Sequence, residues 1–306
     1  MTTTEPLRVD DIDEAILATV AYSDVFDMPI ELDRLHRFLL GVVATRDEVE
    51  TGAARLAESG IIGLAGDLAY LPGREEVLAI HAERVARAET MWSQAISWGR
   101  ALGSLPFVRA VAVTGGLACD SVADHDDIDY LIVTEPGRLW TARLCTVVLV
   151  HVGRRFDVDV CPNYLVAEDA LPLDERTSYS ARELAQMVDI TGSDTLTRMR
   201  EENRWFLDHL PNASIDGVAD RRTAPRLRWL QRGIESVVRT KPFDRLETWE
   251  MRRKIERLKE VASRRAEVAK PDESSFSPSV CKGHMVGNAA GIEVAWRRRI
   301  ADSGAA

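Results

Sequence analysis

Two carboxylates stand one residue apart in an apolar stretch that follows a glycine pair. The pair is Gly115-Gly116, and after ten further residues Asp127 and Asp129 open a run of apolar side chains. Side chains alternate faces along a strand, so these two carboxylates are expected to point the same way. Like charges so placed repel unless a cation lies between them. Oxygen donors favour Mg²⁺, which completes its octahedron with water and phosphate oxygens.

The glycine pair ends a predicted strand over residues 108–113. Glycine has no Cβ, so its backbone N–H groups can approach an anion closely, and the spacing is compatible with a phosphate cradle. Two plainer interpretations stay open. Gly115-Gly116 could be an ordinary turn at a strand end, and the acidic residues around Asp127 could form a solvated loop leading into an edge strand.

A third acidic segment follows one predicted helix. The helix covers residues about 137–150, and the segment 156–160 is expected to be a strand that carries Asp157 and Asp159 on one face, with Cys161 further along that face. We expect Asp159 to be the third carboxylate, because it lies nearer the centre of the predicted strand, and we keep Asp157 as the alternative.

This order of elements resembles the DNA polymerase beta-like nucleotidyltransferase superfamily. The superfamily pattern has a strand, a Gly-Gly or Gly-Ser pair, a spacer of similar length, Asp-x-Asp before apolar residues, and a carboxylate on a later strand. Outside this core, the chain is similar to a bacterial group that joins an N-terminal winged-helix-like segment to such a domain. The segments that carry this wider similarity, which covers about two thirds of the chain, are Tyr22-Ser23-Asp24-Val25-Phe26, Gly137-Arg138-Leu139-Trp140 and Pro162-Asn163-Tyr164.

The resemblance implies an α/β (α+β) protein with a small mixed sheet and a two-ion Mg²⁺ site. Asp127, Asp129 and Asp159 would hold the ions, and Asp159 would be a general base or only a ligand. The implied reaction moves a nucleoside monophosphate, with AMP favoured, from a triphosphate, with ATP favoured, to a hydroxyl of a small molecule or protein. Pyrophosphate would leave.

Phosphate charge would be held by the glycine amides and by neighbouring polar groups. Thr114, Ser121, Arg138 and Arg143 are the candidates that the resemblance suggests. For each arginine a solvated helix face is the more common role, so both interpretations stay open.

Residues 1–75 show the pattern of a winged helix-turn-helix. Helices are expected over 11–23, 29–39 and 45–60, and Thr45 with Glu48 has the spacing of a capping box. A hairpin is expected within 61–70. The segment carries six arginines, no lysine and 15 acidic residues. DNA binding is therefore not expected, because phosphate contacts supply most sequence-independent affinity. Scaffolding, dimerisation or substrate gating fits this charge better.

The remaining organisation follows from hydrophobic periodicity. We expect a linking helix over 76–105, a catalytic domain over 106–190 and a C-terminal helical region over 191–306. Helices are predicted over 181–188, 195–210, 227–238 and 248–268, packed as a bundle, with a linker-like loop over 271–278 and a last helix beyond it. Lys282 and His284 could reach an anionic substrate or serve only capping and packing.

Composition and charge narrow the class of protein to which this chain belongs. The chain has 306 residues, 45% hydrophobic and 29% charged residues and a net charge of −10, which is typical of globular proteins. Residues 221–306 are basic, with 20 Lys and Arg against 11 Asp and Glu, which favours docking on the acidic body or guidance of a nucleotide over nucleic-acid binding.

The four cysteines show no metal-site or disulfide spacing. The N-terminus has no signal-peptide pattern and no segment is apolar enough for a membrane span, so we expect a cytoplasmic protein.

The sequence is also compatible with two other functions. The chain could be a non-enzymatic DNA- or partner-binding protein whose nucleotidyltransferase-like domain is an inert nucleotide sensor. It could also modify a protein partner, such as a toxin.

Overall fold

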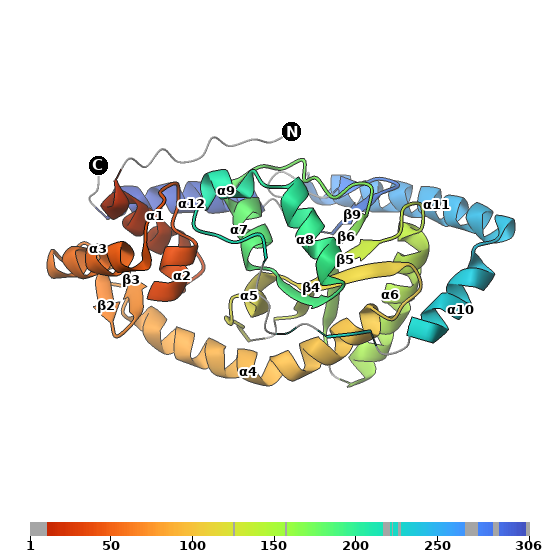
Figure 1. Cartoon of the computed structure of the whole chain (residues 1–306), viewed down its shortest axis with the longest axis horizontal. Helices are drawn as coiled ribbons and strands as arrows, with labels where there is room; N and C mark the ends of the chain where they lie inside the picture. Colours follow the sequence, from red (N-terminus) through yellow and green to blue (C-terminus); the bar gives the residue numbers. More distant parts are fainter. Residues whose placement is uncertain are drawn as a thin grey trace.

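The computed structural model describes residues 11–124, 126–156, 158–216, 221, 223–225, 228–266, 275–283 and 288–303. An N-terminal unit of short helices and a three-stranded sheet lies at one end, and a six-stranded mixed sheet with its helices lies at the other (Figure 1). The long helix α4 (Glu76–Leu102) runs along one side of the molecule and connects them. The α/β (α+β) class expected from the sequence is confirmed at this level.

The N-terminal unit contains the predicted helices and hairpin. The capping box at the start of the third helix is confirmed, because Thr45 accepts from the Glu48 amide and the Glu48 carboxylate accepts from the Thr45 amide. The second helix is shorter than predicted, since residues 30–31 pair with a strand of the hairpin. The elements are α1 (Ile12–Asp24), β1 (Ile30–Glu31), α2 (Leu32–Arg37), α3 (Arg46–Glu58), β2 (Gly63–Ala65) and β3 (Leu68–Tyr70).

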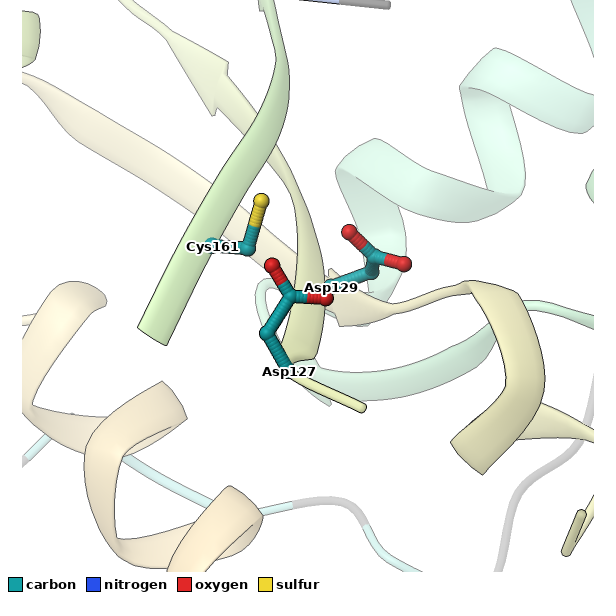
Figure 2. A group of neighbouring side chains, drawn as sticks. All are labelled: Asp127, Asp129 and Cys161. Carbon is teal, nitrogen blue, oxygen red and sulfur yellow. The ribbon is translucent and has the colours of Figure 1, made fainter. Parts of the chain in front are cut away.

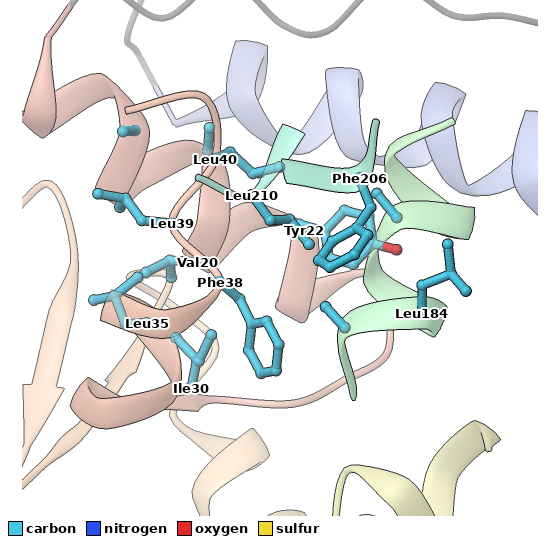
Figure 3. Packing of buried hydrophobic residues seen from close by; sticks show 14 of the residues in the cluster. Val20, Tyr22, Ile30, Leu35, Phe38, Leu39, Leu40, Leu184, Phe206 and Leu210 are labelled. Carbon is cyan, nitrogen blue, oxygen red and sulfur yellow. The ribbon is translucent and has the colours of Figure 1, made fainter. Parts of the chain in front are cut away.

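The N-terminal unit shares one continuous core with two helices from later in the chain, α7 (Ser178–Gln186) and α9 (Phe206–His209). Figure 3 shows Tyr22 and Phe38 beside Leu184 of α7 and Phe206 of α9. All four side chains are at most 5% exposed. Burial of apolar side chains is the main favourable contribution to folding, so this shared core holds the N-terminal unit against the sheet-bearing part.

The six-stranded sheet has the order β7-β4-β5-β6-β9-β8. β5 and β6 are parallel, and every other neighbouring pair is antiparallel. A parallel pair needs a crossover connection, which α6 (Leu139–Gly153) supplies. The strands are β4 (Val108–Val113), β5 (Ile128–Thr134), β6 (Val160–Ala167), β7 (Val188–Thr191), β8 (Ser275–Phe276) and β9 (Val280–Lys282).

The two faces of this sheet bury different cores. Leu131 and Val133 of β5 join the core that contains α1, α7 and α8 (Ser193–Glu202). Tyr130 and Ile132 join the core beneath α4, α6 and α11 (Lys241–Ala266). Because side chains alternate along a strand, Asp129 lies on the face of Leu131. The carboxylates therefore belong to the sheet face that α7 covers.

The predicted strand over residues 156–160 is wrong. Residues Arg154–Phe156 form a 3₁₀ turn, and β6 begins only at Val160 and continues through Pro162 and Tyr164. The apolar alternation around Val158 reflects burial of that side chain, which is 6% exposed, and backbone pairing with β5 starts two residues later. Asp159 consequently precedes the strand.

The C-terminal part contains more strand than predicted. The helix expected over 181–188 ends at Gln186, and β7 follows at once and pairs with β4. The helix expected over 195–210 is two helices, α8 and α9, separated at Asn203, whose side-chain amide donates to the carbonyls of Leu171 and Met199 at 2.9 and 2.8 Å. Within the segment predicted as a loop, residues 275–276 form β8, which pairs with β9, while residues 271–274 lie outside the described residues.

The helices expected further along the chain are present as α10 (Arg228–Val238), α11 and α12 (Asn288–Asp302). The four helices predicted to pack as one bundle are divided between the two cores. α7, α8 and α9 contribute to the core that includes the N-terminal unit, whereas α10 and α11 pack against the other core. α12 lies beside α1 (Figure 1), and the indole of Trp296, 1% exposed, donates to the Ala18 carbonyl at 2.8 Å. The last helix thus completes the N-terminal core. His284 and the end of the predicted helix 248–268 lie outside the described residues.

Among the helices in the described parts of the chain, none combines the length and apolarity needed to cross a bilayer.

Candidate metal centre

The start of β5 holds the two carboxylates beside the turn that follows β4. Val113 of β4 pairs with Tyr130, and the Thr114 amide donates to the Asp129 carbonyl at 3.0 Å. Between the carboxylates, Ile128 is 1% exposed and enters the opposite core. The predicted alternation is confirmed, since Asp127 and Asp129 share the face that Ile128 avoids.

Both glycines are required by close packing, and not only by a turn. Gly115 has φ +67°, and a Cβ there would lie 2.5 Å from Oδ2 of Asp129. A Cβ on Gly116 would lie 2.5 Å from the carbonyl oxygen of Ser121. Any other residue would therefore have to displace the carboxylate or the backbone behind it. The glycine pair and the Asp-x-Asp pair form one packed unit.

The short helix α5 (Gly115–Ala118) is held in place from two other elements. Asp120, which follows it with φ +53°, accepts from Arg34 of α2 at 2.8 Å and from the Trp92 indole of α4 at 2.7 Å. Charge-assisted hydrogen bonds of this length are among the stronger polar contacts in proteins. The N-terminal unit and the linking helix thus position the turn beside the carboxylates.

Cys161 of β6 completes a group of three potential metal donors with Asp127 and Asp129. One donor atom from each residue lies within 4.8 Å of the others, and Figure 2 shows the thiol beside the two carboxylates. The group arises from the parallel register, in which Asp129 is opposite Cys161. Asp127 is exposed, whereas Asp129 and Cys161 are partly buried, so the group opens to solvent on one side.

A bulge in β6 follows directly after Cys161. Asp129 is opposite Cys161 and Leu131 is opposite Tyr164, so two steps on β5 correspond to three on β6. The irregular stretch contains Pro162. Proline has no N–H to donate, and it is tolerated at a bulge. Because of the extra residue, both Cys161 and Tyr164 face the α7 side of the sheet.

The electrostatics of the group disfavour three anions together. Burial, and after it the Asp127 carboxylate, raises the pKa of Asp129 to about 7, although a hydrogen bond with Cys161 acts in the opposite direction. Burial and both carboxylates also raise the pKa of the Cys161 thiol. A divalent cation among these groups would remove the repulsion that contributes to these shifts.

The structure does not bring Asp159 into this group. Its side chain is exposed and precedes β6, and its carbonyl accepts from the Ile128 amide at 2.8 Å. The alternative, Asp157, lies outside the described residues. The position that the parallel register places opposite Asp129 is occupied by Cys161, so a thiol stands where the sequence led us to expect a carboxylate.

Of the predicted phosphate contacts, Thr114 and Ser121 lie beside the carboxylates and are buried. Thr114 precedes α5, and the Ser121 amide donates to the Gly116 carbonyl at 2.9 Å. Both residues shape the turn through their backbones. Whether their hydroxyls contact a phosphate stays a prediction.

Arg138 and Arg143 lie away from the carboxylates. Arg138 follows the far end of β5, pairs with Asp244 and stacks on Phe107 at 5.3 Å from the ring centroid. Arg143 stacks on Trp140 and interacts with Cys281, whose side chain belongs to the opposite core. In this structure neither arginine contacts the donor group.

Sequence reasoning missed Glu183 of α7. Its carboxylate accepts a hydrogen bond from Gln186, whose Nε2 lies 2.7 Å away. Burial raises the pKa of Glu183, while Gln186 and the nearby Gly115 amide lower it, and the charge of Glu183 in turn contributes to the raised pKa of Asp129. A helix was predicted here, but no local spacing connects Glu183 with Gly115.

Lys282, a predicted candidate for contact with an anionic substrate, is on the same sheet face. Its ammonium group lies 2.6 Å from Glu175, and both side chains are less than a third exposed. Its positive charge also lowers the pKa of Glu183. In this structure Lys282 is therefore a paired cation near the edge of the site.

Compared with protein-family models, with curated proteins and with solved structures, the chain matches none of them.

Proposed function

We propose that this protein is a metal-dependent nucleotidyltransferase. The observation that carries the proposal is the contact of Gly115 with Asp129, because it packs a glycine turn against a carboxylate that belongs to a group of metal-donor side chains. Phosphate chemistry needs two features together: donors that hold a cation, and backbone amides close to that cation.

The donor set fits a divalent cation in charge and spacing. Asp127 and Asp129 supply two carboxylates on one strand face, and their mutual repulsion is the state that a cation relieves. When bound, the cation supplies charge neutralisation at the phosphates and lowers the pKa of an acceptor hydroxyl. Asp127 is exposed and Asp129 is partly buried, so an ion held by the pair would remain accessible from solvent.

In the proposed reaction the acceptor oxygen forms a bond to the α-phosphorus of a nucleoside triphosphate, and the bond to the β-phosphate oxygen breaks. The acceptor proton passes to a carboxylate, and exposed Asp159 is our candidate for this role. Pyrophosphate leaves. The Gly115 amide, which lies near the Glu183 carboxylate, is our candidate donor to a phosphate oxygen.

We also propose a polymerase beta-like nucleotidyltransferase fold for the sheet-bearing part and a winged-helix-like fold for the N-terminal unit. The parallel β5–β6 pair, joined by α6, and the glycine turn after β4 support the first. The helices and hairpin of residues 12–70 support the second. We assign the N-terminal unit a scaffolding or gating role, because Arg34 anchors the site turn and α3 carries acidic side chains.

Calorimetry tests this function directly. Full-length protein is titrated with each of the four ribonucleoside triphosphates in the presence of Mg²⁺ or Zn²⁺, and the double variant Asp127→Asn/Asp129→Asn is compared with Asp124→Asn. Asp124 is an exposed neighbour in the same loop, paired with Arg87, and it lies outside the donor group. We expect metal-dependent binding, with ATP favoured, in the wild type and Asp124→Asn only.

Two outcomes contradict the proposal. If the double variant binds triphosphate as tightly as the wild type, the carboxylates do not hold the metal–nucleotide complex. If α-labelled triphosphate binds but no label reaches any acceptor in a lysate or metabolite pool, the chain is a nucleotide sensor and not a transferase. A labelled protein band would specify a protein acceptor.

A further inference from the structure

We propose that Cys161 is the third metal ligand of this site and that its thiolate makes the site select Zn²⁺ over Mg²⁺. The inference rests on the proposed function, because it concerns the cation of the same site. Cys161 lies opposite Asp129 across the parallel β5–β6 pair, and its sulfur belongs to the group whose donor atoms lie within 4.8 Å of one another.

The surroundings of Cys161 differ from those of the other thiols. Cys281 is buried in an apolar core, Cys119 donates to Gln186 at 3.1 Å, and Cys145 lies on the outer helix α6. Cys161 belongs to neither core cluster and interacts with two carboxylates instead. A thiol is a weak hydrogen-bond donor, so in the metal-free state this position gains little from its contacts.

No described carboxylate competes for the third place. Asp159 is exposed and outside the group. Asp126 and Glu183 are also outside it, since the Asp126 carboxylate accepts from the Ala123 amide at 2.7 Å and the Glu183 carboxylate accepts from Gln186 at 2.7 Å. Asp157 lies outside the described residues. Two carboxylates and one thiol are therefore the donor set that the β5–β6 register assembles.

This donor set disagrees with Mg²⁺ in its chemistry. Mg²⁺ demands oxygen ligands in near-octahedral geometry, whereas thiolate with carboxylate suits Zn²⁺, and Co²⁺ is its usual spectroscopic substitute. Zn²⁺ bonds oxygen at about 2.1 Å and sulfur at about 2.3 Å, which donors within 4.8 Å of one another can reach by small side-chain rotations. Coordination would require the thiol proton to pass to solvent, and the three side chains would leave the ion able to accept a phosphate oxygen as a further ligand.

The test titrates metal-free, full-length protein with Co²⁺ under anaerobic conditions and records the sulfur-to-cobalt charge-transfer band. We expect one band that saturates at one ion per chain in the wild type and in Cys145→Ser. We expect no band in Cys161→Ser and a loss of Co²⁺ affinity of about tenfold or more. Zn²⁺ should displace Co²⁺, and Mg²⁺ in about hundredfold excess should not.

A second variant keeps the test independent of any folding defect. Cys161→Asp supplies the carboxylate that the sequence pattern leads one to expect, so it should lose the band but bind Mg²⁺ more tightly than the wild type. A band that persists in Cys161→Ser, Co²⁺ binding without a band in the wild type, or displacement of Co²⁺ by equimolar Mg²⁺ would overturn the inference.

The two proposals fail in different ways. If the wild type shows the Cys161-dependent band but binds no nucleoside triphosphate, the metal ligand is right and the nucleotidyltransferase is wrong. If the wild type shows no band and binds Mg²⁺–triphosphate no better than Cys161→Ser does, the metal inference is wrong and the function stands.

Discussion

A Cβ at position 115 would lie 2.5 Å from Oδ2 of Asp129, at a backbone φ of +67°. Gly115 and Asp129 thus depend on each other: the carboxylate can occupy its place only while the turn opposite it carries no side chain. The relationship joins two motifs that are separate in the sequence into one geometric unit, and it can be tested by the smallest possible substitution.

Gly115→Ala is expected to cost stability for two reasons, a strained φ and a steric conflict with Asp129. Together they should lower the free energy of unfolding by about 2–4 kcal/mol and weaken divalent-metal binding. Gly66→Ala is the matched control, because Gly66 has φ +65° and a Cβ there would meet nothing within 4 Å. It should show the strain cost alone, about 1 kcal/mol. Urea denaturation and metal titration measure both effects, and equal costs for the two variants would contradict the steric argument.

Asp129→Asn is expected to stabilise the metal-free protein at high pH. The folded-state pKa of Asp129 is raised from 3.8 to about 7, so the folded protein binds this proton more tightly than the unfolded chain. The associated stability is fully present below about pH 4 and is lost as the pH rises to about 7. Asparagine carries no such proton, so near pH 8 the variant should unfold with a free energy about 1–3 kcal/mol above that of the wild type.

Urea denaturation in EDTA at pH 4, 6 and 8 checks this sign, and Asp124→Asn, which changes an exposed acid in the same loop, is the control. The advantage of Asp129→Asn should disappear when the wild type is loaded with metal, because a bound cation stabilises only the folded state that holds it. A variant that is less stable than the wild type at pH 8 without metal would contradict the raised pKa.

Glu183→Gln is expected to tighten nucleoside triphosphate binding. The Glu183 carboxylate lies near the Gly115 amide, so a phosphate that approaches this amide meets a negative charge. Glutamine keeps the shape and an acceptor oxygen but loses the charge, and we expect the Kd to fall about three- to tenfold. Calorimetry measures the change, and Glu201→Gln on the exposed side of α8 is the control. Weaker binding in Glu183→Gln would show that this carboxylate supports the complex instead.

Asp189→Asn is expected to be strongly destabilising. Asp189 of β7 lies 2.6 Å from Arg200 of α8, and both side chains are 0% exposed. Removing one charge leaves the other buried without its counter-charge, which costs about 3–5 kcal/mol. The surface pair Arg297–Glu293 is the control, since breaking it should cost about 1 kcal/mol or less. Thermal and urea unfolding of Asp189→Asn and Glu293→Gln make the comparison, and similar costs would contradict the role of burial.

Several elements could be predicted from the sequence because their determinants are local. The capping box at Thr45, the strand that ends before Gly115 and the alternation of Asp127, Ile128 and Asp129 each depend on residues within a few positions of one another. The same holds for α4, whose long helical periodicity spans 27 residues. Local periodicity and capping chemistry act before any tertiary contact is made.

The extra strands of the sheet could not be predicted in the same way. β7 has four residues and β8 and β9 have two and three, and such short segments form strands only because a neighbouring edge is available to pair with. Around Val158, an apolar alternation resembled a strand although pairing begins only at Val160. The alternation there indicates which side chains are buried, whereas pairing depends on where β5 offers an edge.

By itself the sequence determined the glycine turn, the two carboxylates on one face and the class of chemistry that they suggest. The tertiary structure decided which residues join them. The parallel register of β5 with β6 placed Cys161 beside Asp129 and left Asp159 exposed, and the packing of α7 brought Glu183 to the Gly115 amide. These choices depend on pairing between distant segments, where a shift of one residue exchanges the side chains on a face. The sequence of each segment is compatible with more than one pairing register, and only the pairing in the folded sheet selects one.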